Sequence, residues 1–198
     1  MNSVSPDPMT IICHFYPDDT PLRRLLIRHS LQVRDKALAI LDRSGVEADR
    51  ELVAAAAMLH DIGIGRCHAP KIFCDGVLDY MAHGFAGAAM LREYARKYGV
   101  DLEACARVCE RHTGSGLLAS DIRRLRLAAP VRDYLPETTE EKVICLADKF
   151  FSKSGDMREK SLARIRRGLR RFGEAPLERF DALCRGFGID EGNPPETI

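Results

Sequence analysis

Six side chains that can bind a divalent metal fall on apolar helix faces, or at the end of an apolar helix, in the amino-acid sequence. They are His29, His60, Asp61, His83, His112 and Asp148. Burying an ionised aspartate costs free energy unless a partner compensates its charge. A hydrogen-bonded core histidine would explain any one of these positions, but a single site for divalent cations would explain all of them together.

The apolar periodicity predicts the helices that would position these side chains. His29 lies on the apolar stripe of a helix that starts at Thr20-Pro21 and ends at Gly45, which are residues typical of a helix start and stop. His60 and Asp61 end a helix that is apolar on almost every side. The predicted helices cover about residues 19–45, 49–62, 80–98, 101–112 and 120–127, a segment starting at 138, and residues 156–172 and 176–187. Residues 66–78 are predicted to be a loop, no strand pattern stands out, and we expect an all-α protein.

The composition is that of a globular protein without an obvious charged partner. The 198 residues are 45% hydrophobic and 30% charged, with a net charge of +1, so the overall charge does not indicate binding to nucleic acid or to a membrane. No apolar run has the length of a membrane span, and no secretion signal stands at the start. The seven cysteines include no CxxC pair. We therefore expect a cytoplasmic protein with reduced cysteines.

The chain is expected to form one metal-binding unit with short appendages. We assign residues 1–18 to a loose N-terminal arm and residues 19–155 to the metal-binding helical domain. Residues 156–190 are expected to be C-terminal helices packed on the same domain. Residues 191–198 contain two consecutive prolines and are expected to be a frayed tail.

The segment Ala-Ala-Met-Leu-His-Asp-Ile-Gly at residues 56–63 resembles the signature of the HD superfamily, and in particular of its HDIG branch. The positions of His29 in the preceding helix and of Asp148 in a late helix are similar to those of the family. The segments around His83 and His112 resemble those that supply a second metal site in dinuclear members. The resemblance covers about residues 20–155 and implies an HD-domain helical bundle.

The resemblance also implies a ligand set for one or two divalent transition metals. The implied ligands of the first metal are His29, His60, Asp61 and Asp148, and those of the second are His83 and His112, with Asp61 as a bridge. Nitrogen and oxygen ligands without a thiolate suit Mn²⁺, Fe²⁺, Co²⁺, Ni²⁺ or Zn²⁺ better than Ca²⁺, and they do not choose among these metals. Such a metal pair activates water for attack on a phosphate ester.

We therefore expect a metal-dependent phosphohydrolase whose partner is a nucleotide-like or other small phosphorylated substrate. Asp61, as the bridging ligand, is the first catalytic candidate. Many HDIG proteins have a phosphate-contacting lysine directly after the motif, where this chain has Ile64. The candidates to replace that lysine are Arg66, Arg111, Lys149 and Lys153. Of these we select Lys149 and Arg111 as the further catalytic residues.

Other functions and the oligomeric state stay open on the sequence. Some HD-superfamily members have a similar set of four histidines and two aspartates around a mixed-valence di-iron pair, and they activate O₂ to cleave organic substrates. A further alternative is a non-catalytic HD module that binds a nucleotide as a sensor. Iron content together with oxygen consumption would distinguish the oxygenase from the hydrolase. A homo-oligomer is compatible with the sequence.

Two additional patterns receive less weight. The basic residues between Arg158 and Arg171 could contact nucleic acid, but no aromatic residues are interleaved with them to stack on bases, and a solvated helix face also explains them. Cys67, His68 and Cys74 lack a fourth partner for a structural zinc ion. The sequence therefore argues against a nucleic-acid partner and against a structural zinc site.

Overall fold

The computed structural model of the protein describes residues 6–190, so the predicted frayed tail at 191–198 lies outside the described residues. Helices dominate, which confirms the predicted all-α architecture. With η for short 3₁₀ helices, the elements are α1 (Pro8–Phe15), α2 (Pro21–Ser44), α3 (Arg50–Leu59), η1 (Ile64–Arg66), β1 (His68–Ala69), η2 (Pro70–Ile72), β2 (Cys74–Asp75), η3 (Tyr80–Ala82), α4 (His83–Tyr98), α5 (Glu103–Arg111), α6 (Ala119–Arg124), α7 (Thr139–Lys149), α8 (Leu162–Leu169), η4 (Arg170–Phe172) and α9 (Glu174–Gly186). None of the helices within residues 6–190 combines the length and apolar character needed to cross a bilayer.

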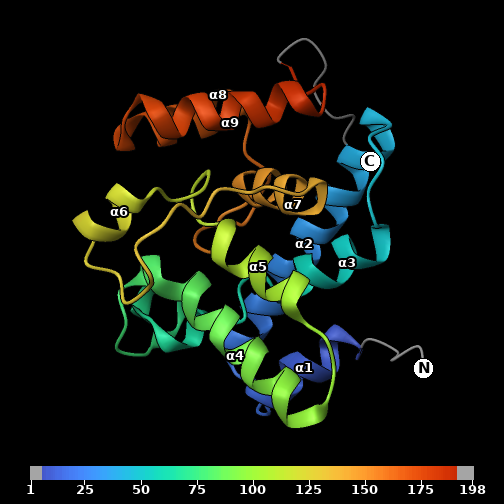
Figure 1. Ribbon diagram of the computed structural model, residues 1–198, viewed down its shortest axis with the longest axis vertical. Coiled ribbons are helices and arrows are strands. Elements are labelled where there is room, and N and C mark those ends of the chain that lie inside the picture. The colour runs from blue at the N-terminus through green and yellow to red at the C-terminus, as the bar shows by residue number, and fades with distance from the viewer. Residues whose placement is uncertain (1–5, 191–198) are drawn as a thin grey trace.

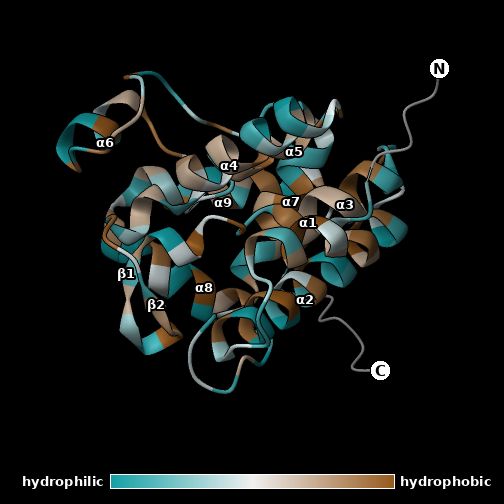
Figure 2. Ribbon diagram, turned by 90° about the horizontal axis from the view of Figure 1, so that it is seen from below, coloured by the Kyte–Doolittle hydropathy of each residue, from teal (hydrophilic) through white to brown (hydrophobic). Residues whose placement is uncertain are grey.

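The apolar helix α3 lies at the centre of the bundle. It packs against α1, α2, α5 and α7, and Val53, Ala56 and Ala57 on it are fully buried. Helices α4 and α5 pack against each other, and α8 and α9 lie together at the α7 end of the molecule (Figure 1). Hydrophobic residues of α2, α3 and α7 are buried in the core, and they give these helices the brown stretches in Figure 2. The C-terminal end of α3, which carries His60 and Asp61, is therefore placed inside the bundle.

Side-chain caps set the ends of the helices that carry the predicted ligands. The Thr20 side chain accepts a hydrogen bond from the backbone of Arg23, and Gly45 ends α2 with a positive φ of 65°. Thr138 and Glu141 form a capping box at the start of α7. These caps satisfy backbone groups that a helix end leaves without partners, and they agree with the helix starts predicted at residues 20 and 138.

The N-terminal arm differs from its prediction. In place of a loose segment over residues 1–18, residues 8–15 form α1, which Asp7 caps by accepting a hydrogen bond from the backbone of Met9. Ile11 and Ile12 of α1 are fully buried, and the helix packs against α3. The burial of these two isoleucines orders the segment, and an eight-residue helix is too short to be ordered without such packing.

The loop predicted at residues 66–78 contains short regular elements, so the expectation of no strand was wrong there. Strands β1 and β2 pair antiparallel, with His68 opposite Asp75 and Ala69 opposite Cys74. The helix predicted over 156–172 begins only at Leu162, because Ser161 caps it. Just before this cap the chain comes back to the end of α7, where the Lys160 amide donates a hydrogen bond to the Phe150 carbonyl. This return places Lys153 and Lys160 beside the end of α7.

Candidate metal centre

The His60-Asp61 pair follows directly after the last residue of α3. The helix changes to 3₁₀-type hydrogen bonds, in which the amide of Ile62 donates to the carbonyl of Leu59. The next glycine, Gly63, lies so close to α4 that a Cβ atom on it would overlap the backbone of His83 and Gly87. This tight turn directs both His60 and Asp61 into the bundle, and it explains why a glycine is needed two residues after Asp61.

Four of the predicted ligands form a first group, which consists of His29, His60, Asp61 and Asp148. The Oδ2 atom of Asp61 lies 3.3 Å from His29 Nε2 and 3.2 Å from His60 Nε2. The Oδ1 atom of Asp148 lies 3.0 Å from His29 Nε2 and 3.6 Å from His60 Nε2. One ligand atom from each of the four residues lies within 4.8 Å of the other three, so these atoms could surround a single cation.

The second carboxylate oxygen of Asp61 faces a second group. Its Oδ1 atom lies 3.4 Å from His83 Nε2 and 3.3 Å from His112 Nε2. Asp61 is therefore the one residue shared by the two groups that the described part of the chain contains. A carboxylate that turns one oxygen to each group has the geometry of a bridging ligand.

Backbone carbonyls orient three of the four histidine rings. The Nδ1 atoms of His60, His83 and His112 lie within hydrogen-bonding distance of the carbonyls of Ala57, Tyr80 and Cys109, each three residues earlier in the chain. A carbonyl can only accept a hydrogen bond, so each Nδ1 carries a proton, and each ring, when neutral, presents an Nε2 lone pair. The Nε2 atoms of His83 and His112 face each other at 2.9 Å. A nearby cation would remove the repulsion between these lone pairs.

The burial of the site makes its polar groups costly without a cation. Asp61 and His60 are both 0% exposed. Within residues 6–190, no well-aligned hydrogen bond reaches Asp61 Oδ1 or His60 Nε2, and Lys153 is the one ammonium group beside Asp61 Oδ2. Buried acceptors without donors destabilise a protein, and a divalent cation satisfies them all. The residues present therefore fit one or two divalent metals with nitrogen and oxygen ligands.

The charges of the cluster shift its pKa values in opposite directions. Burial alone would lower the pKa of His60, but the carboxylates of Asp61 and Asp148 raise it to about 9. Burial would raise the pKa of Asp61, but His60 and Lys153 hold it well below its usual value. Burial lowers the pKa of His83 to about 3. The site therefore contains ionised carboxylates and at least one neutral imidazole near neutral pH, as metal binding requires.

Two of the four basic residues considered from the sequence lie at the site. Lys149 Nζ lies 2.6 Å from Asp148 Oδ2, and Lys153 Nζ lies 2.7 Å from Asp61 Oδ2. Although burial opposes it, the Asp61 carboxylate raises the pKa of Lys153 well above its usual value, so this lysine is charged. Lys153 was one of the four candidates in the sequence but was not selected, because its place next to Asp61 depends on the irregular segment after α7.

The selection of Arg111 as a catalytic residue is corrected by the structure. Its guanidinium donates to the Leu135 carbonyl and pairs with Glu137 at 2.9 Å, and it does not line the cavity at the site. Arg111 therefore stabilises the segment before α7. Arg66 is exposed and does not line the cavity either. Cys67, His68 and Cys74 form no metal-binding group among the described residues.

A cavity of about 510 Å³ opens beside the ligand groups, and His83, His112 and Asp148 form part of its wall. Basic side chains line much of the rest: Lys71, Arg124, Lys149, Lys153, Lys160 and Arg179. Leu169, Phe172 and Pro176 bring the C-terminal helices into the same wall. Cations outnumber the two lining aspartates, Asp121 and Asp148, so the cavity suits an anionic ligand.

Comparisons with known proteins agree with this architecture. A family model described as HD domain matches residues 26–152. The chain is 38% identical over 128 residues to a tRNA (cytidine(56)-2'-O)-methyltransferase of Picrophilus torridus, covering 65% of this chain and 32% of that protein. It is 36% identical over 126 residues to an uncharacterized protein of Methanocaldococcus jannaschii, covering 62% and 64% of the two chains. The chain thus spans less than two thirds of the length of these relatives.

Solved structures of a bacterial HD domain are also similar to this chain. The HD domain of the L. monocytogenes phosphodiesterase PgpH has a TM-score of 0.46 at 18% identity, covering 86% of this chain and 98% of that chain. The same domain in complex with cyclic-di-AMP has a TM-score of 0.48 at 18% identity, covering 96% and 98%.

Proposed function

Because the chain belongs to the HD domain family, we propose that it is a metal-dependent phosphohydrolase with two divalent metals, acting on a nucleotide-like or other small phosphate ester. The observation that carries this proposal is the position of Asp61. Its two carboxylate oxygens face two separate groups of buried ligands. This is the arrangement that a pair of hydrolytic metals needs.

Divalent cations held by these groups would supply positive charge to the phosphoryl oxygens and lower the pKa of a water molecule for attack. The reaction consumes one water, whose oxygen bonds to phosphorus while the ester oxygen leaves with a proton. Asp61 and Asp148 stay ionised, and their negative charge would hold the divalent cations in the site. Lys149 and Lys153 lie beside these carboxylates, where their ammonium groups can neutralise charge on the leaving ester.

The basic lining of the cavity favours an anionic substrate over a neutral one. Its wall carries six basic side chains next to the metal ligands. Ammonium and guanidinium groups form charge-assisted hydrogen bonds with phosphate oxygens, which a neutral molecule does not offer. One of the relatives is named for a reaction on tRNA, but this chain covers only 32% of that protein, so we do not propose that activity here.

The test combines metal content with hydrolysis of a generic ester. Purified protein loaded with Mn²⁺ or Zn²⁺ is analysed by elemental mass spectrometry and assayed with bis(p-nitrophenyl) phosphate and p-nitrophenyl phosphate. We expect two metals in the wild type, fewer in Asp61→Ala and His112→Ala, and a loss of turnover of about 10³-fold in Asp61→Ala, since the metals stabilise charge in the transition state. The control is His68→Ala, because His68 is exposed and lies outside both groups. This variant should keep the metal content and the turnover of the wild type.

Other results would contradict the proposal. Turnover in Asp61→Ala equal to that of the wild type, with unchanged helical circular dichroism, would remove Asp61 from the mechanism. Bound iron with substrate-dependent oxygen uptake and no ester hydrolysis would identify an oxygenase. A bound nucleotide that is recovered unaltered from metal-loaded protein, with no turnover of either ester, would identify a sensor module.

A further inference from the structure

A groove of about 490 Å³ runs along α8 and η4 and adjoins the cavity of the metal centre. The cavity and the groove have five lining residues in common: Lys149, Ser152, Lys160, Leu169 and Phe172. Lys149 also pairs with Asp148, one of the candidate metal ligands. A ligand that extends out of the cavity past Lys149 would therefore enter this groove.

The groove lining contains five basic residues and no acidic one. Its basic residues are Lys149, Lys160, Arg164, Arg167 and Arg171, and its lining includes no aspartate or glutamate. In the described part of the chain, no carboxylate pairs with Lys160, Arg164, Arg167 or Arg171. Arg166 of the same helix, by contrast, pairs with Asp181 at 2.8 Å. Like charges that are gathered without counterions attract a polyanion.

The pKa of Lys160 reflects its burial first and the neighbouring cations second. Burial lowers the pKa of Lys160 to about 8, and although Asp148 opposes the shift, Lys149, Lys153 and Arg164 lower the pKa further. An anion bound between these cations would relieve their repulsion.

An aromatic ring stands where the cavity meets the groove. Phe172 lines both hollows, and its side chain is 74% exposed. In the sequence Phe172 directly follows Arg170 and Arg171, and the fold adds Lys149 and Lys160 to the lining of the same two hollows. Exposed aromatic rings beside basic residues provide stacking surfaces for the bases of single-stranded nucleic acids. An acidic peptide would use the cations but would not need such a ring.

We propose that the groove binds the nucleotides next to the scissile phosphate of a single-stranded oligonucleotide, with one base stacked on Phe172. This inference rests on the proposed function, because it places the scissile phosphate at the metal centre. It changes the expected substrate from a small ester that fills only the cavity to a chain of phosphodiesters. It also revises the sequence-based argument against nucleic acid, which depended on the absence of an interleaved aromatic residue.

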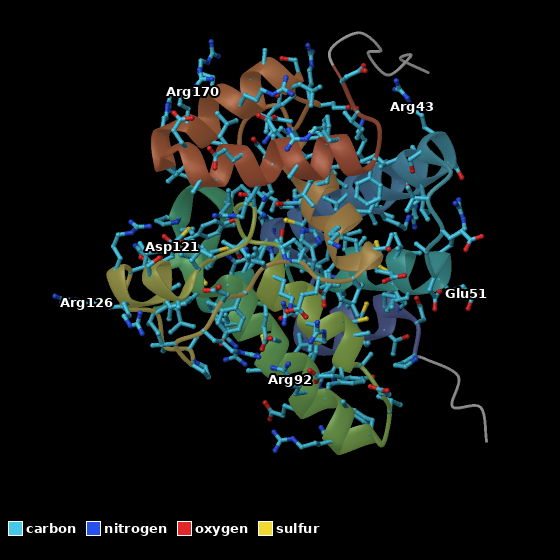
Figure 3. All side chains as sticks on the ribbon, turned by 45° about the horizontal axis from the view of Figure 1, so that its top comes forward. Arg43, Glu51, Arg92, Asp121, Arg126 and Arg170 are labelled. Atoms are coloured by element: carbon cyan, nitrogen blue, oxygen red, sulfur yellow. The ribbon has the colours of Figure 1, made fainter. Side chains whose placement is uncertain are left out.

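Binding is measured by fluorescence anisotropy with labelled single-stranded hexamers of RNA and of DNA, using Asp61→Ala protein so that no cleavage occurs. If three phosphates are neutralised, the affinity should fall roughly twentyfold between 50 and 200 mM salt. Arg167→Glu, Arg171→Glu and Phe172→Ala, each in this background, should each weaken binding by about fivefold or more. Arg170→Glu is the matched control, because Arg170 carries the same charge in η4, does not line the groove and points outward in Figure 3; it should bind normally.

Hydrolysis assays distinguish a failure of the groove proposal from a failure of the proposed function. In the metal-loaded enzyme, the ratio of kcat/KM for the hexamer to kcat/KM for bis(p-nitrophenyl) phosphate should fall about fivefold or more in Arg171→Glu. Equal binding by the groove variants, by Arg170→Glu and by the parent protein would overturn the inference and leave the proposed function intact. Polyglutamate or duplex DNA that binds as tightly as the hexamer, independently of Phe172, would also overturn it. Failure to hydrolyse any ester would contradict the proposed function, while the binding data would still test the groove.

Discussion

At the residue scale, the chemistry of the site depends on the two oxygens of Asp61. Each oxygen lies within 3.4 Å of two imidazole Nε2 atoms, and the carboxylate is fully buried. An isolated carboxylate in such a place would be protonated, but the charges of His60 and Lys153 keep its pKa low despite the burial. Asp61 is therefore ready to bind cations without first losing a proton.

His60 makes metal binding depend on pH. Without metal, its pKa is raised to about 9 by Asp61 and Asp148 against the effect of burial, so a proton occupies the ring at pH 7 and must leave before a metal binds. Metal affinity should therefore rise about tenfold per pH unit between pH 7 and 9 and level off above that range. Isothermal titration calorimetry with Zn²⁺ in buffers of different ionisation enthalpy would measure both the affinity and the released proton. An affinity that stays constant over this range would contradict the prediction, and His68→Ala should behave as the wild type does.

At the element scale, α1 supports the metal centre from outside the ligand set. The Tyr16 hydroxyl directly after α1 donates a hydrogen bond of 2.6 Å to the carbonyl of Ile62, and it accepts one of 3.1 Å from the amide of Gly65. It thereby closes the turn that follows Asp61. Burial raises the pKa of Tyr16 to about 12, so the hydroxyl keeps its proton and remains a donor.

Replacing Tyr16 with Phe should loosen this turn. Groups that lie outside the ligand set and orient the ligands through hydrogen bonds typically contribute 10-fold to 100-fold to metal affinity. We therefore expect Zn²⁺ binding in Tyr16→Phe to weaken by about tenfold or more. Losing a buried hydrogen bond should also lower the free energy of unfolding by about 1–2 kcal/mol. Calorimetry and urea unfolding would measure these changes. Tyr98→Phe is the control, since Tyr98 is 47% exposed, and a Tyr16→Phe protein that binds metal like this control would show that the hydroxyl is not needed.

At the scale of the whole molecule, the metal centre joins segments that are far apart in the chain. His29 comes from α2 and Asp148 from α7, while the remaining ligands come from the end of α3, the start of α4 and the end of α5. Ions bound at this junction would hold together the central helices of the bundle. The site is therefore a structural element as well as a candidate catalytic centre.

Metal removal should consequently lower thermal stability. A ligand that binds only the folded state at a hundred times its Kd stabilises that state by about 2.7 kcal/mol, which for a chain of this size corresponds to a rise in Tm of about 5–10 °C. Differential scanning calorimetry with EDTA and with Zn²⁺ would measure the shift. Asp61→Ala should show a much smaller metal-dependent shift, and an equal shift in both proteins would place the stabilising ion elsewhere.

The sequence by itself determined the all-α class, the HD domain and the six positions that the fold brings together. It could do so because helical periodicity and capping are local, and because a polar ligand on an apolar helix face stands out without any knowledge of neighbours. His29 and Asp148 are a clear instance. They are 119 residues apart, yet both are recognisable in the sequence, and in the structure His29 Nε2 lies 3.0 Å from Asp148 Oδ1.

Only the tertiary structure decided which surrounding groups face the site. Arg111 and Lys153 have similar charges in the sequence, but Arg111 turns to Glu137 and Lys153 to Asp61. The order of α1 depends on the burial of Ile11 and Ile12, and the place of Phe172 depends on how the C-terminal helices close the cavity. Long charged side chains, short helices and irregular segments carry little local information, because their conformation is set by contacts with residues distant in the chain.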